Sequence, residues 1–242
     1  MAFSLFALPI FSLTAVYVAA ALFPAVFLMG YIYRADTIEK EPPGLLMSLV
    51  GRGVLAALAA MVLEILGQQL LPRFVSPESP GYVACFAFLV VAAAEEGCKL
   101  FFLYRRTWQD PNFNCRFDGI VYAAFVSLGF AAYENLRYVF SYGLQVALPR
   151  AILAVPGHLG FAVFMGYFYS RARLAADRRR PAAARGNLLL GYGAAVALHG
   201  VYDTCCMAGT GASTAAFVGF VAVMYLAVIR LIRREARKNQ FI

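Results

Sequence analysis

The sequence contains little charge. Of its 242 residues, 14% are charged and 62% are hydrophobic, whereas soluble domains contain about 25% charged and about 45–50% apolar residues. A soluble globule of this length needs a polar surface, and the few charges here are clustered, with long uncharged runs between them. The scarcity of charge therefore excludes a soluble globular protein and predicts that lipid covers most of the surface.

Cysteine patterns that form disulfides or bind zinc are also missing. No two cysteines have the Cys-x-x-Cys spacing, and the five are scattered (Cys85, Cys98, Cys115, Cys205 and Cys206). They predict neither a disulfide framework nor a zinc finger. The sequence has no internal repeat and no polar segment long enough for a separate soluble domain. We therefore expect one integral membrane domain over residues 1–242.

Long apolar stretches, in contrast, are abundant. Stretches of about 20 apolar residues predict membrane-spanning helices. Seven are found, at about residues 3–33, 45–71, 82–104, 118–140, 151–174, 187–207 and 214–232. The first has no basic leader and is too long for a signal peptide, so we expect it to span the membrane as well. The fold class predicted is an all-α, polytopic membrane helix bundle with about seven transmembrane helices.

The basic residues predict the orientation of this bundle. There are 21 Lys and Arg against 13 Asp and Glu, a formal net charge of +8. Sixteen of the 21 follow the first, third, fifth and seventh stretches, whereas only Arg73 and Arg150 follow the others. Because Lys and Arg accumulate in cytoplasmic segments, we expect the N-terminus outside and the C-terminus in the cytoplasm. Topology thus explains the positive charge without a nucleic-acid partner.

Ionisable side chains inside the apolar stretches are few and therefore informative. Each costs roughly 2.5–3.5 kcal/mol at the bilayer centre, so such residues usually face the bundle interior and mark function. The polar and ionisable residues concerned are Glu95, Glu96, Lys99, Glu134, Asn135, Arg137, His158, His199 and Asp203. With a rise of about 1.5 Å per residue, the carboxylates and imidazoles would form one layer between mid-membrane and the outer face.

The spacing of these residues favours a single site. Residues four apart share a helix face, which pairs Glu95 with Lys99, Phe130 with Glu134 and His199 with Asp203. A carboxylate can accept the second ring N–H of a histidine and fix the tautomer that a ligand or base needs. Two adjacent carboxylates cannot both be comfortably ionised in a low dielectric, so one member of the glutamate pair suits general acid or base work. Carboxylates and imidazoles around a dry pocket are also a suitable ligand set for Zn²⁺.

Structural roles remain open for the same residues. The glutamate pair could form an ion pair with Lys99 or Arg52 that holds helices together, and His158 could make an interhelical hydrogen bond. Arg137 would either neutralise Glu134 or extend to the outer headgroups. A proton- or ion-coupled transporter would use a similar layer to relay charge, although the related halves typical of transporters are not found.

Several short motifs follow one another in a recognisable order. They are D-T-I-E-K-E-P (Asp36–Pro42), E-E-x-x-K (Glu95, Glu96, Lys99), F-x-x-x-E-N (Phe130, Glu134, Asn135), an isolated His158, and H-x-x-x-D (His199, Asp203). In this order and span placement the sequence resembles the PrsW family of intramembrane proteases, which is distantly similar to the CAAX prenyl endopeptidases. The resemblance covers about Asp36 to Asp203 and leaves out the last stretch and the basic tail.

The resemblance implies a peptidase and a role for each motif residue. It implies that the catalytic residues are Glu95, Glu96, Lys99 and Asn135, that metal or water is bound by Glu134, His158 and His199, and that Phe130 and Asp203 are supporting residues. Which glutamate acts as the base, and whether the mechanism uses a metal at all, stay open. If a metal is used, one divalent ion is expected, with Zn²⁺ favoured.

The resemblance also implies the partners. We expect a membrane-anchored protein substrate, such as a single-pass anti-sigma factor, cut near its extracytoplasmic side, together with the lipid bilayer and no nucleic acid. The protein would be a multi-pass protein of the cell membrane. A non-catalytic scaffold of the same fold is a further alternative, and the sequence does not reveal the oligomeric state.

Overall fold

The computed structural model describes the backbone of residues 2–241 and the side chains of residues 13–241. Over this range the chain is almost entirely helical, with no strand beyond an isolated bridge between Cys115 and Phe241. The helices are α1 (Ala2–Ala35), α2 (Pro43–Leu70), α3 (Tyr82–Cys85), α4 (Ala93–Thr107), α5 (Asp118–Tyr142), α6 (Ala147–Ile152), α7 (Ala154–Asp177), α8 (Pro181–Met207) and α9 (Gly211–Arg237). A π-helical segment, Phe86–Ala92, joins α3 to α4 without a break. The predicted all-α bundle is confirmed.

Helices suit apolar segments in lipid because all their backbone groups are paired within the segment. Five stretches are long and apolar enough to cross a membrane: Leu13–Ala35, Pro43–Arg73, Asp118–Tyr142, Leu144–Asp177 and Gly211–Arg237. The other two expected stretches are also helical, as α3 to α4 and as α8, but these two carry the glutamate pair, Lys99, His199 and Asp203. The protein is thus a polytopic helix bundle, and a count of seven spanning helices stays a prediction.

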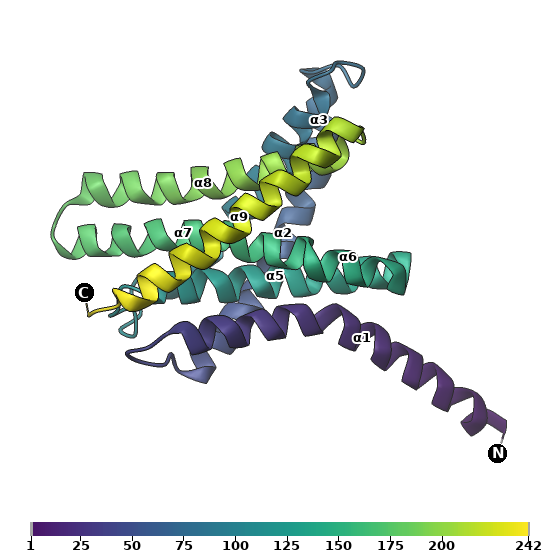
Figure 1. Cartoon of the computed structure of the whole chain (residues 1–242), viewed down its shortest axis with the longest axis horizontal. Helices are drawn as coiled ribbons and strands as arrows, with labels where there is room; N and C mark the ends of the chain where they lie inside the picture. Colours follow the sequence, from purple (N-terminus) through teal and green to yellow (C-terminus); the bar gives the residue numbers. More distant parts are fainter. Residues whose placement is uncertain (1, 242) are drawn as a thin grey trace.

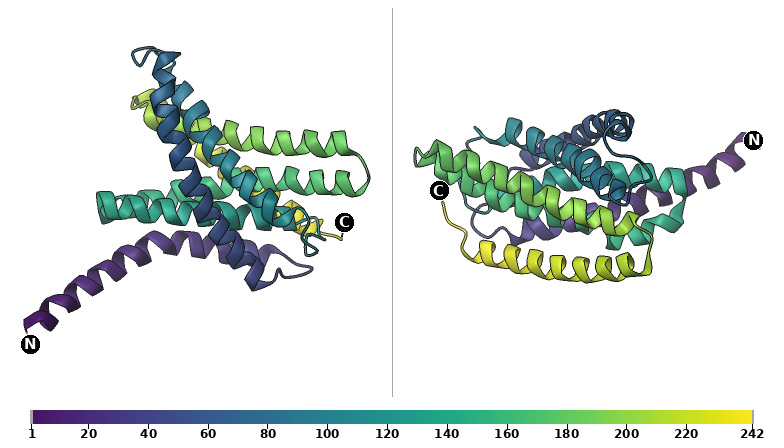
Figure 2. Two further views of the ribbon diagram at one scale, coloured as in Figure 1. Left: turned by 180° about the vertical axis from the view of Figure 1, so that it is seen from behind. Right: turned by 90° about the horizontal axis from the view of Figure 1, so that it is seen from above.

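The connections between helices gather at two ends of the molecule. The α1–α2 loop, the α4–α5 loop, the α7–α8 turn and the C-terminus lie together at the left of Figure 1, and the view from behind in Figure 2 agrees. We refer to this as the C-terminal end. The N-terminus and the α5–α6 and α8–α9 connections lie away from it. The segments predicted to be cytoplasmic are therefore the ones that meet at the C-terminal end.

Helix α5 forms the centre of the bundle and packs against α1, α2 and α7. Its first half is buried on all sides. Glycines permit the closest approaches, because a Cβ on Gly53 of α2 would collide with the Val126 carbonyl oxygen of α5, and one on Gly129 would collide with the backbone of Val50. Small residues at such crossings let helix backbones touch. These contacts hold α5 in the position from which it reaches the polar layer.

Acidic side chains are buried in the loop between α1 and α2. Asp36 and Glu41 are 2% and 5% exposed, and each has one carboxylate oxygen without a hydrogen-bond partner. Asn239 in the C-terminal segment donates to Asp36 Oδ1 at 3.2 Å. Burial raises the pKa of the Glu41 carboxyl to about 8 from its ordinary value of 4.5, with a further contribution from the negative charge of Asp118. The Glu41 carboxyl therefore binds a proton more tightly in the folded protein than in the unfolded chain.

Candidate active site

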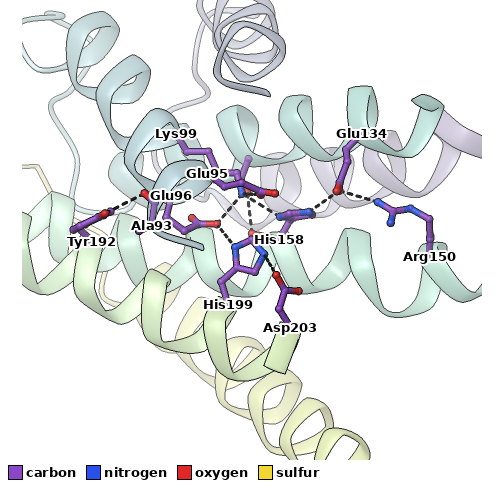
Figure 3. A network of polar contacts seen from close by, with 11 residues as sticks. Ala93, Glu95, Glu96, Lys99, Glu134, Arg150, His158, Tyr192, His199 and Asp203 are labelled. Atoms are coloured by element: carbon purple, nitrogen blue, oxygen red, sulfur yellow. Dashed lines mark hydrogen bonds and ion pairs between the residues drawn. The ribbon is translucent and has the colours of Figure 1, made fainter. Parts of the chain in front are cut away.

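Four helices bring the polar residues of the membrane layer together (Figure 3). Helix α4 contributes Glu95, Glu96 and Lys99, and these three side chains are 5%, 0% and 2% exposed. Helix α5 contributes Glu134, α7 contributes His158, and α8 contributes His199 and Asp203. The single polar layer expected from the sequence is therefore one connected network.

The Lys99 ammonium lies at the centre of this network. Its Nζ donates to Glu95 Oε2 at 3.0 Å and to Glu96 Oε1 at 2.7 Å, and it lies 3.1 Å from His158 Nδ1. It also lies 4.0 Å from the centre of the Phe130 ring, a distance at which the ring face attracts a cation. Charge-assisted hydrogen bonds of this kind are stronger than neutral ones, and the ammonium balances one of the two carboxylate charges.

His199 lies between two carboxylates. Its Nδ1 is 2.9 Å from Glu96 Oε1, and its Nε2 is 3.3 Å from Asp203 Oδ2. The Phe161 ring stacks on the imidazole with the ring centres 4.6 Å apart, which fixes the plane of the ring. Both partners are carboxylate oxygens, so each of them can accept a ring N–H of His199, and Nδ1 becomes a ligand only when it gives up its proton.

A second chain of contacts connects His158 with the part of the bundle away from the C-terminal end. Its Nε2 is 3.0 Å from Glu134 Oε2, and the same oxygen accepts from Arg150 Nη2 at 2.8 Å. Arg150 also donates through Nε to Asn135 Oδ1 at 2.9 Å, and Asn135 Nδ2 donates to the Ala21 carbonyl of α1 at 2.7 Å. Lys99 on one ring nitrogen and Glu134 on the other therefore hold the His158 imidazole in one orientation.

Four of these residues could hold a metal ion. One ligand atom from each of Glu95, Glu96, His158 and His199 lies within 4.8 Å of the others, and all four residues are buried. Two imidazoles and two carboxylates suit Zn²⁺, and Glu96 Oε2 is a buried oxygen without a hydrogen-bond partner. The donor set fits a divalent cation. However, Lys99 contacts three of the four residues, so the ammonium and a metal are alternative occupants of the same place.

The network borders a cavity of about 400 Å³. Glu95, Glu134, His158, His199 and Asp203 line it, whereas Glu96 does not. The remaining wall comes from the last turns of α5, from α6, from the start of α7, from the end of α8 and from the start of α9. It includes Tyr138, Arg150, Leu153, Met207 and Phe217. The cavity therefore lies toward the end of the bundle opposite the C-terminal end.

The grouping differs from the sequence prediction in two respects. Glu134, predicted as a metal ligand, contacts Arg150 and His158 and lies outside the group of four residues that could hold a metal. That group contains both Glu95 and Glu96. Asn135, predicted as catalytic, spans Arg150 and the backbone of α1 and does not line the cavity. The physical reason is that an arginine sixteen residues away neutralises Glu134 and positions the Asn135 amide.

Arg150 is the site residue that sequence reasoning missed, since it counted there only as a charge of an outer loop. Arg137, which was expected to neutralise Glu134 or to reach the headgroups, donates instead to the Met61 sulfur at 3.2 Å. A signal for Arg150 does exist in the sequence. It is a lone cation about two helical turns before His158, in one of the connections predicted to lie outside, where few other basic residues occur.

Comparison with known proteins identifies the family. Residues 41–230 match the model of the PrsW family intramembrane metalloproteases. Protease PrsW of Geobacillus kaustophilus is 36% identical over 186 residues, which are 77% of each chain. Protease PrsW of Bacillus subtilis is 32% identical over 187 residues, 77% of this chain and 80% of the relative. That of Shouchella clausii is 30% identical over 220 residues, 91% of this chain and 97% of the relative. The chain belongs to the PrsW family.

Membership of the PrsW family confirms several sequence predictions. The protein is an intramembrane protease and a multi-pass membrane protein, and the transporter alternative is not favoured. All the PrsW motifs recognised between Glu95 and Asp203 lie inside the matched range. No solved structure matches the chain.

Proposed function

We propose that the protein hydrolyses a peptide bond of a membrane-anchored protein, with Glu95 as the general base. The observation that carries this proposal is the difference between the two glutamates. Glu95 lines the cavity, whereas Glu96 is fully buried and is held by Lys99 and His199. Only Glu95 can therefore meet water or a substrate in the cavity, and Glu96 acts by orienting its two partners.

The reaction requires a proton to be moved twice. The Glu95 carboxylate takes a proton from water, and the water oxygen forms a bond with the carbonyl carbon of the substrate. The protonated Glu95 then gives this proton to the peptide nitrogen, the C–N bond breaks, and a carboxylic acid and an amine form; the acid passes its proton to the amine, so that a carboxylate and an ammonium ion leave. Lys99, 3.0 Å from Glu95 Oε2, attracts the carboxylate form of the base and provides positive charge beside the carbonyl oxygen, where negative charge develops.

A bound Zn²⁺ would polarise the substrate carbonyl and activate the water. The residues that would hold it are Glu96, His158 and His199, which would leave Glu95 free as the base. Catalytic zinc sites commonly combine three protein ligands with an open position. With the ion bound, Asp203 would accept the Nε2 proton of His199 and Glu134 would accept that of His158, which would leave each Nδ1 free to bind the ion.

The substrate class follows from where the cavity lies. Its wall is formed near the α5–α6 and α8–α9 connections, away from the C-terminal end that carries most of the basic residues. With the C-terminal end in the cytoplasm, the cavity lies toward the extracytoplasmic side. A single-pass protein such as an anti-sigma factor would present its outer juxtamembrane segment there. This assignment rests on the predicted orientation and on the resemblance that motivated it.

The test compares glutamate variants in proteoliposomes that contain a tagged single-pass anti-sigma factor. Glu95→Gln is expected to lower cleavage by at least about 100-fold while the melting temperature stays near that of the parent. Glu96→Gln is expected to lower both, because Lys99 and His199 lose their shared partner. Glu64→Gln is the matched control, since Glu64 belongs neither to the four-residue group nor to the cavity wall. Cleavage by Glu95→Gln at the parent rate would refute the mechanism.

A further inference from the structure

A second cavity lies at the C-terminal end of the bundle and is lined by arginines. It has a volume of about 230 Å³ and lies between the end of α7, the start of α8 and the segment that leads into α5. Four guanidinium groups border it, from Arg116, Arg171, Arg178 and Arg180, and no acidic residue does. Four like charges around one cavity repel one another, so an anion in this place would lower the energy of the folded protein.

The arginines are poorly neutralised by the protein itself. Arg116 pairs with Glu235 at 2.9 Å, and Arg171 donates to the Tyr167 hydroxyl at 3.1 Å. Within residues 13–241, no carboxylate pairs with Arg178 or Arg180. The cavity thus has more positive charge than its protein neighbours balance.

A neutral donor completes the wall. Ser170 of α7 lines the cavity and is 4% exposed, and its Oγ is buried without a hydrogen-bond partner. A buried hydroxyl without a partner is costly, and such groups are usually satisfied by protein, water or a ligand. Asn187 of α8 supplies a further polar side chain to the same wall. Guanidinium groups together with a hydroxyl and an amide form a donor set suited to phosphate oxygens.

We propose that this cavity binds a phosphate group. Two sources share this chemistry: the headgroup of an anionic phospholipid and free phosphate. The position of the cavity agrees with the first source, because the C-terminal end is the end predicted to be cytoplasmic, where basic pockets between helices bind anionic headgroups. A ligand there would connect α7 and α8, the helices that carry His158 and His199, with the segment before α5.

The α7–α8 turn offers a matched control. Arg179 and Arg185 belong to the same basic segment, but they line a different cavity, together with Trp108 and Leu188. The test pair is Arg178→Gln with Arg180→Gln, and the control pair is Arg179→Gln with Arg185→Gln. Both pairs remove two positive charges from the same basic segment, so a general loss of charge affects both alike.

The experiment uses the purified, delipidated full chain in a neutral detergent. Phosphatidylglycerol is titrated into the protein, and native mass spectrometry counts the lipid molecules that remain bound; phosphatidylcholine is the zwitterionic comparison. Binding of inorganic phosphate is measured separately by the shift in melting temperature. For the test pair we expect phosphatidylglycerol affinity about thirtyfold below that of the parent, with the control pair close to the parent. If the test pair does not fold, Ser170→Ala serves instead, with a loss of about tenfold.

The outcomes separate the two sources. Binding of phosphatidylglycerol without binding of inorganic phosphate assigns the cavity to a lipid headgroup, whereas binding of both assigns it to phosphate in general. The proposal would be overturned if the test and control pairs lost phosphatidylglycerol affinity equally. It would also be overturned if the protein showed no preference for phosphatidylglycerol over phosphatidylcholine and did not bind inorganic phosphate.

Discussion

Replacing Lys99 with methionine should increase the affinity of the protein for Zn²⁺. Lys99 Nζ contacts Glu95, Glu96 and His158, three of the four residues that could hold a metal. Methionine keeps an unbranched side chain of similar length and has no charge. The substitution therefore removes the competing cation and leaves the metal-binding side chains in place.

The distances allow the size of the effect to be worked out. With the ammonium about 4 Å from a divalent ion, the repulsion is about 8 kcal/mol at an effective dielectric constant of about 20, so Lys99 must withdraw when the metal enters. Withdrawal gives up the charge-assisted hydrogen bonds to Glu95 and Glu96, at 3.0 and 2.7 Å, each worth about 1.5–3 kcal/mol. A total of at least about 3 kcal/mol corresponds to roughly 100-fold in affinity.

Competition with a zinc indicator in detergent micelles measures this affinity after treatment with a chelator. Elemental analysis gives the stoichiometry, and circular dichroism checks that the variant is folded. Arg137→Met is the control, because Arg137 contacts the Met61 sulfur rather than the four metal-binding residues. A folded Lys99→Met protein that binds Zn²⁺ no more tightly than the parent would refute the competition between ammonium and metal. Absence of binding in both proteins would show that the four residues are not a metal site.

Three further predictions concern the outer contacts, the loop and the packing of the bundle. Arg150→Met removes the 2.8 Å ion pair with Glu134 and should lower kcat/KM by about 10- to 100-fold, whereas Arg137→Met should retain parent activity; equal kinetics for the two variants would contradict this. The Glu41 pKa is raised from 4.5 to about 8 in the folded protein. The contribution of Glu41 to stability is therefore complete below pH 4.5 and is lost as the pH rises to 8. Over this range the free energy of unfolding should fall by at most about 1.4 kcal/mol per pH unit. Melting curves of Glu41→Gln should lack this slope, and an unchanged pH profile would show that Glu41 does not cause it. Gly53→Ala should destabilise the protein by about 1–3 kcal/mol, because the added Cβ meets the α5 backbone; Gly51→Ala, which meets nothing within 4 Å, should not, and similar melting temperatures for both would refute the argument.

Most helix positions could be predicted from the sequence, because apolar length is a strong constraint in lipid. The stretch predicted at 118–140 is α5, Asp118–Tyr142, and that at 214–232 lies within α9, Gly211–Arg237. The π-helical turns over Phe86–Ala92 were not predicted, because a wider turn leaves the apolar content of a segment unchanged.

The site could be predicted within each helix but only partly between helices. The rule that residues four apart share a face gave the contacts of Glu95 with Lys99 and of His199 with Asp203, and both are confirmed. The same rule put Phe130 and Glu134 on one face of α5, and both contact His158 of α7. The approach of the Phe130 ring to the Lys99 ammonium of α4 was not predicted. Contacts such as Lys99 with His158 depend on how α4 packs near α7, which spacing along one helix does not reveal.

The position of Lys99 also has a consequence for how the protein is made. Two buried glutamates without a counter-charge would oppose insertion and folding, but this chain carries its own cation one turn away, which balances one of the two carboxylates. The newly made protein can therefore complete its helix bundle in the membrane whatever the local supply of zinc. Under the proposed metal-assisted mechanism, biogenesis and activation become separate events, and cells short of the ion would accumulate a folded protease rather than a degraded one.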